Sequence, residues 1–235
     1  MSAPLAATVT SVTDLATETP APVDVLMAER PVWRGLMHGW AFALSIPGGV
    51  LLILVADPVA ARVAAAIYVG TLLLTFGTSA AYHRLAQSYR ARSVMRRLDH
   101  SMLYLLIAGT YVPMCLVALP KAWGIPLLSV VGAMAIVGIT IKLVAIRSLS
   151  WLGYALYPIM GWCAVVAAPA LGAHLSPVQL ALIFAGGVAY TVGFPVLMLR
   201  RPDPWPTVFG YHEVWHSFTV VAAAMHFGAV ALLLA

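Results

Sequence analysis

The sequence predicts an all-α membrane protein whose chain crosses the bilayer seven times. Of its 235 residues, 62% are hydrophobic and only 9% are charged, and the mean hydropathy is +0.95. A soluble domain carries roughly 25% charged residues, so this chain has too few charges to cover a surface that faces water. Soluble globular proteins, nucleic-acid binders and disordered chains are thereby excluded, in spite of the net charge of +5.

Residues 1–30 are predicted to form a flexible cytoplasmic tail, followed by a membrane domain over residues 31–235. The first 29 residues contain no Lys or Arg and no long apolar run, so they do not have the pattern of a signal peptide. Four acidic residues are scattered through this stretch among Ala, Thr and Pro: Asp14, Glu18, Asp24 and Glu29. This composition is typical of solvated chain.

Seven segments then meet the requirement of about 20 mainly apolar residues for a spanning helix. They cover residues 35–56, 61–83, 101–119, 123–144, 150–171, 177–199 and 210–235. Asp57-Pro58 separates the first two segments, and Arg200-Arg201-Pro202 follows the sixth, as turn and charge signals should. Because lipid offers no hydrogen-bond partner to an open backbone, each segment is predicted to be a helix.

The basic residues between the spans predict the orientation. Basic residues gather in cytoplasmic loops, and eleven of the 13 Lys and Arg residues lie before the first span or in the loops on that same side. Five of them separate the second and third spans: Arg84, Arg90, Arg92, Arg96 and Arg97. The N-terminus is therefore expected in the cytoplasm and the C-terminus outside, with the plasma membrane as the expected location. A clamp for anionic lipid is an alternative role for these five arginines.

Ionisable side chains inside the predicted spans lie mostly at one depth. Such groups are costly in a bilayer, so each is a candidate functional residue. His83 ends the second span, Asp99 and His100 open the third, and His212 and His216 open the seventh. In the predicted orientation these are all cytoplasmic ends, so three helices are expected to bring imidazoles and a carboxylate to one level.

Residues 212–216 read His-Glu-Val-Trp-His, which is the H-E-x-x-H pattern. Residues four apart share a helix face, so both imidazoles can bind one zinc ion. A third ligand is needed, and His226 lies about 15 Å further along the helix, which makes His83 the candidate. Ser79 is one turn from His83 on the same face. The alternative interpretation is a pair of interfacial histidines hydrogen-bonded to backbone.

These motifs resemble the hemolysin III family, which is related to the progestin and adipoQ receptors and so to the adiponectin receptors. The resemblance runs from about residue 34 to the C-terminus. It is carried by Ser79-x3-His83, Leu98-Asp99-His100-Ser101 and His212-x3-His216-x9-His226-Phe227. It implies a seven-helix bundle with an intracellular N-terminus and a zinc ion held by His83, His212 and His216. It also implies that an acid at Asp99 hydrogen-bonds the metal-bound water, with Ser79 close by.

One residue departs from the pattern of the adiponectin receptors, which carry Gln where this chain has Glu213. Chemistry shared with them cannot depend on Glu213. That favours Asp99 as the group that activates water, and it leaves Glu213 as a supporting group or an alternative base. A helix N-cap is the alternative role for Asp99. The long N-terminal domain of those receptors is missing here, so hormone recognition is not carried over.

Three functions stay open at this point. We favour zinc-dependent hydrolysis of an acyl lipid amide such as ceramide, in which Asp99 takes a proton, Ser79 donates to the oxyanion and the substrate enters from the bilayer. The second is a membrane-homeostasis sensor with structural zinc. The third and least supported is a pore-forming cytolysin, because the charges gather at one end instead of lining a path. An intramembrane metalloprotease would need a further acidic ligand. Membrane lipids are the expected partners, and no nucleic-acid partner is expected. The roles of His38, His100 and His226 stay open.

Overall fold

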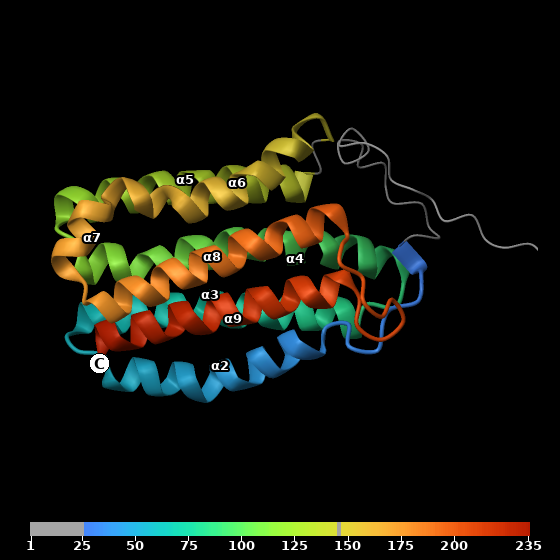
Figure 1. Cartoon of the computed structure of the whole chain (residues 1–235), viewed down its shortest axis with the longest axis horizontal. Helices are drawn as coiled ribbons and strands as arrows, with labels where there is room; N and C mark the ends of the chain where they lie inside the picture. The colour runs from blue at the N-terminus through green and yellow to red at the C-terminus, as the bar shows by residue number, and fades with distance from the viewer. Residues whose placement is uncertain (1–25, 145–146) are drawn as a thin grey trace, which may run out of the picture.

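The protein is a bundle of long helices (Figure 1). The computed structural model describes residues 26–144 and 147–235. Within that part of the chain, seven helical segments are long and apolar enough to cross a membrane. The β-structure in the described residues is one isolated antiparallel bridge between Trp205 and Phe209. The predicted all-α, seven-span fold is confirmed.

The spans follow one another along the chain. They are α2 (Leu36–Val55), α3 (Val59–Arg84), α4 (Tyr89–Pro113) with a π-helical end η2 (Met114–Ala118), α5 (Lys121–Val144), α6 (Ser150–Trp162) continued by η4 (Cys163–Ala167) and α7 (Ala168–His174), α8 (Pro177–Leu199) and α9 (Tyr211–Leu234). A short 3-10 turn, η3 (Arg147–Leu149), precedes α6. Predicted and observed boundaries agree to within three residues, except at the start of α4.

Helix α4 begins well before the apolar segment that predicted it, at Tyr89 instead of residue 101. Ser88 caps it, since its hydroxyl accepts a hydrogen bond from the Ala91 N–H at 3.2 Å. An apolar run marks only the part of a helix that lies in lipid. The sequence therefore did not predict the polar first turns of α4. Asp99 and His100 are therefore inside a helix, and the N-cap interpretation of Asp99 is excluded. All five arginines assigned to a loop are helical: Arg84 ends α3, and Arg90, Arg92, Arg96 and Arg97 lie in α4.

The last helix brings distant parts of the chain together. Helix α9 packs along α8 and also contacts α2, α3 and α4, while α5 and α6 form a layer on the far side of α4 (Figure 1). Tyr68, Tyr104 and Met160 are among the side chains buried in the core. The α5 backbone approaches Tyr104 so closely at Gly138 that a Cβ there would collide with the ring. This packing brings the ends of α2, α3, α4 and α9 together.

Residues 26–30, the end of the predicted tail, pack against the bundle. Leu26 is buried, and its carbonyl accepts a hydrogen bond from Arg92 Nη1 at 2.8 Å. Arg30 donates to the carbonyls of Tyr82 and His83, at 2.8 and 2.6 Å. These five residues thus belong with the membrane domain, whereas residues 1–25 of the predicted tail lie outside the described residues.

The two ends of the described chain lie at opposite ends of the bundle, as an odd number of spans requires (Figure 1). With the orientation that the basic residues predict, alkaline phosphatase fused after Ala235 is expected to be active and green fluorescent protein at the same position dark. Fusions after Arg201, at the other end of α8, serve as the control and should give the opposite pair of results. A fluorescent, phosphatase-negative fusion after Ala235 would refute the orientation.

Candidate metal centre

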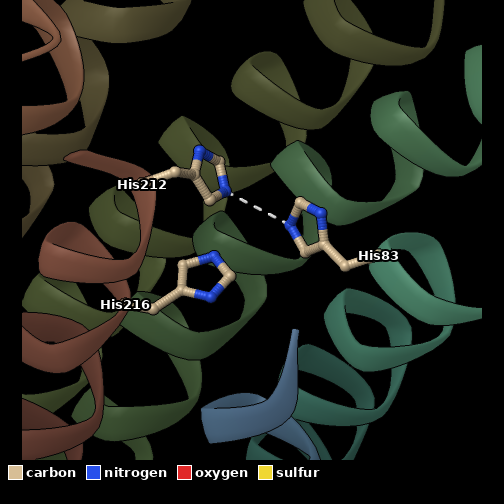
Figure 2. Close-up of side chains that lie close together, drawn as sticks. All are labelled: His83, His212 and His216. Atoms are coloured by element: carbon tan, nitrogen blue, oxygen red, sulfur yellow. Dashed lines mark hydrogen bonds between the residues drawn. The ribbon is translucent and has the colours of Figure 1, made fainter. Parts of the chain in front are cut away.

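Three histidines from two helices face one another near the end of the bundle where the described chain begins (Figure 2). His83 lies in the last turn of α3, and His212 and His216 lie in the first two turns of α9. One ligand nitrogen from each ring is within 4.8 Å of the other two. The Nε2 atoms of His83 and His212 are 3.2 Å apart. The three histidines could therefore hold a metal ion.

The geometry and the chemistry of these rings fit a tetrahedral ion. Two nitrogens that each lie about 2.0–2.1 Å from such an ion are roughly 3.3 Å apart, which is close to the observed separation of His83 and His212. His83 and His216 are buried, and their Nδ1 atoms have no hydrogen-bond partner among the described residues. Nothing in the described part thus supports the alternative of histidines held by backbone carbonyls.

A fourth histidine, His38 of α2, packs against this cluster. Its ring stacks on His216, with centroids 3.7 Å apart and planes 8° from parallel, and its other neighbour is the edge of Phe76 at 5.1 Å. It is only 3% exposed, and neither ring nitrogen has a hydrogen-bond partner within the described ranges. The sequence left the role of His38 open.

Glu213 is fully buried, and both of its carboxylate oxygens are engaged. Oε1 forms an ion pair with Arg34 Nε, and Oε2 accepts a hydrogen bond from the Gly210 N–H at 2.8 Å. Sequence reasoning did not single out Arg34. These contacts hold the start of α9 against the segment before α2, next to the histidines.

Breaking this pair from its two sides is expected to have unequal effects on stability. Arg34→Ala leaves a buried carboxylate without its cation and should lower the free energy of unfolding by on the order of 3 kcal/mol. Glu213→Gln keeps a neutral acceptor for Gly210 and should lower it by only about 1 kcal/mol. Thermal unfolding in one detergent measures both, with Arg201→Ala as an exposed control. Equal midpoints for Arg34→Ala and the parent protein would show that the pair contributes nothing.

Asp99 and Ser79 lie side by side where α4 packs on α3. Ser79 is 2% exposed, and its Oγ has no well-formed hydrogen bond within the described residues, although the Asp99 carboxyl is its neighbour. In the same part of the chain, Asp99 has no ion-pair partner within 4.0 Å. The structure thus contrasts Glu213, whose carboxylate has an ion-pair partner, with Asp99, whose carboxylate has none among the described residues.

A pocket of about 360 Å³, which we call the mouth pocket, opens over the histidines. His83 and His212 form part of its wall. The other polar residues that line it are Glu29, Arg30, Arg34, Tyr82, Arg96, His100, Tyr154, Arg200 and Tyr211. A metal ion held by the histidines would therefore lie beside a space large enough for a polar head group.

A second space of about 250 Å³, which we call the apolar cavity, lies between α4, α6, α8 and α9. Leu197 lines both this cavity and the mouth pocket. His226 lines the apolar cavity, and its Nε2 is 3.1 Å from the Ile183 carbonyl oxygen. A neighbouring apolar pocket of about 310 Å³ shares His226 and reaches Val165 and Phe184, which are 57% and 63% exposed on the bundle surface.

The chain is similar to known bacterial proteins. A profile of the family described as Haemolysin-III related matches residues 26–227. The Hemolysin-3 homolog of Bacillus subtilis (strain 168) is 32% identical over 205 residues, which are 86% of this chain and 93% of that protein. Hemolysin-3 of Bacillus cereus is 33% identical over 205 residues, 86% and 90% of the two chains. The profile match includes every candidate site residue.

Proposed function

The chain belongs to the Haemolysin-III-related family, and we propose that it is an integral membrane zinc protein that hydrolyses an acyl lipid amide at the cytoplasmic side of the bilayer. One observation carries the proposal. Three clustered histidines lie at the end of the bundle beside a polar pocket, and that pocket adjoins a cavity suited to an acyl chain.

His83, His212 and His216 are the residues that would hold the zinc. Zinc bound by three histidines supplies Lewis acidity toward a carbonyl oxygen and lowers the pKa of a water molecule. Asp99 is the proposed base, since it has no ion-pair partner among the described residues. Ser79 is the proposed donor to the developing oxyanion, because its buried hydroxyl lies next to Asp99 and one helical turn from His83.

The apolar cavity supports a lipid substrate. Its wall is made mainly of Leu, Ile, Phe, Tyr and Trp side chains from four helices. The neighbouring pocket that shares His226 includes exposed residues of the bundle surface, such as Phe184. An acyl chain that entered sideways from the bilayer would bring its polar end toward the mouth pocket, since Leu197 lines both spaces.

A structural role for zinc in a membrane-homeostasis sensor is the second candidate. The histidine cluster joins α3 to α9, and its members His83 and His212 are 129 residues apart in sequence. His38 packs against the cluster. A metal ion here would stabilise the contact between two distant helices. Cytolysis, which the name of the Bacillus cereus relative suggests for that protein, ranks lower because the cavities beyond the mouth pocket are apolar.

The deciding experiment measures metal content and fatty-acid release on the same preparation. The full chain is reconstituted in phosphatidylcholine nanodiscs with ceramide and N-palmitoylethanolamine. A hydrolase is expected to carry about one zinc per chain, to stop releasing palmitate after treatment with a chelator, and to recover when zinc is returned. Stoichiometric zinc without release of any fatty acid would favour the sensor.

A further inference from the structure

The mouth pocket carries a strong excess of positive charge. Four arginines line it, Arg30, Arg34, Arg96 and Arg200, against the single carboxylate of Glu29. Glu213 offsets Arg34. Arg30 donates to two backbone carbonyls, which hold its guanidinium in place and leave its charge uncompensated.

Two of these guanidinium groups are available to a ligand. Neither Arg96 nor Arg200 has a hydrogen bond or an ion pair with another described residue. Arg96 is on α4, one turn before His100 and three residues before Asp99, so all three share a helix face. Arg200 is the C-cap of α8 and lines the same pocket.

From this arrangement we propose that the mouth pocket selects an anionic head group, so that the lipid amide bound here bears a carboxylate or phosphate. This inference rests on the proposed function and names its substrate class. Arginine guanidinium groups bind both anions through charge-assisted hydrogen bonds. A neutral head group such as that of ceramide leaves Arg96 and Arg200 without a charged partner.

The orientation signal of basic residues explains why arginines lie at this end of the bundle, but not why four of them line one pocket. Four others near the same end are exposed and do not line it: Arg84, Arg90, Arg97 and Arg201. They supply a matched control, because Arg90 is also on α4 and Arg201 directly follows Arg200.

The test compares the binding of three palmitoyl amides to the full chain in phosphatidylcholine nanodiscs: N-palmitoylglycine, the phosphate monoester of N-palmitoylethanolamine, and uncharged N-palmitoylethanolamine. The two anionic lipids are expected to bind about tenfold more tightly than the neutral one. This ratio corresponds to the free energy that one charge-assisted hydrogen bond contributes to binding. The variant Arg96→Gln/Arg200→Asn should reduce this ratio to near one, whereas Arg90→Gln/Arg201→Asn should leave it unchanged. Asn is chosen at position 200 because the backbone there is left-handed, with φ 54°.

Each outcome decides the proposal. Equal affinities for the three lipids in the parent protein would refute it, as would an equal loss of preference in both double variants. The single variant Arg96→Gln, with its thermal unfolding midpoint measured alongside, separates loss of the anion site from misfolding. A preference for one anionic lipid alone distinguishes a carboxylate site from a phosphate site. Binding is measured without turnover, so failure to hydrolyse any of these lipids would refute the proposed hydrolase and not the anion preference.

Discussion

Asp99→Asn is expected to keep its zinc and to lose lipid hydrolysis by about 10²–10⁴-fold, the usual effect of removing a general base. The three histidines come from α3 and α9, whereas Asp99 is on α4 beside Ser79. Asparagine occupies nearly the same volume, so the helix should pack as before, but it cannot accept the proton. Zinc content by elemental analysis and palmitate release are measured on one preparation.

Glu213→Gln is the matched control for that experiment. Both changes remove one negative charge near the histidines, and Gln is the residue type that the adiponectin receptors carry at this position. Because Glu213 already pairs with Arg34 and accepts a hydrogen bond from Gly210, its loss should lower stability and leave zinc and most of the activity. If Glu213→Gln were inactive while Asp99→Asn still released palmitate, the base would be Glu213 and the proposed roles would be reversed.

His83→Ala is expected to remove most of the bound zinc, leaving well under half an ion per chain after dialysis, because two ligands hold zinc weakly. His226→Ala is the control on the same helix as His216, since residue 226 lies about 15 Å beyond it and lines the apolar cavity instead. Elemental analysis of both purified variants gives the comparison.

The outcome for His83→Ala also tests whether His38, which packs against the cluster, is a zinc ligand. Near-stoichiometric zinc in this variant would eliminate His83 as the third ligand. If zinc were lost from His38→Ala and retained in His83→Ala, the third ligand would be His38, which stacks on His216 and has two ring nitrogens without partners in the described part of the chain.

The sequence by itself predicted the all-α fold and the boundaries of six spans to within three residues. These are local properties, because a helix that crosses lipid must satisfy its own backbone over about 20 apolar residues. The sharing of a face by His212 and His216 is local too, since four residues make about one helical turn. The start of α4 was missed because its first turns are polar, so no apolar run marked them.

Tertiary structure alone decided which side chains meet around those histidines. The pairing of Glu213 with Arg34 and the stacking of His38 on His216 join segments that are distant in sequence, and the contact of Asp99 with Ser79 joins two consecutive helices. The spans are apolar around most of their circumference, since lipid and protein neighbours both accept such residues, so no hydrophobic stripe fixes how each helix is rotated. The rotation follows from close packing between helices, and it determines that Glu213 pairs with Arg34 while Asp99 lies beside Ser79.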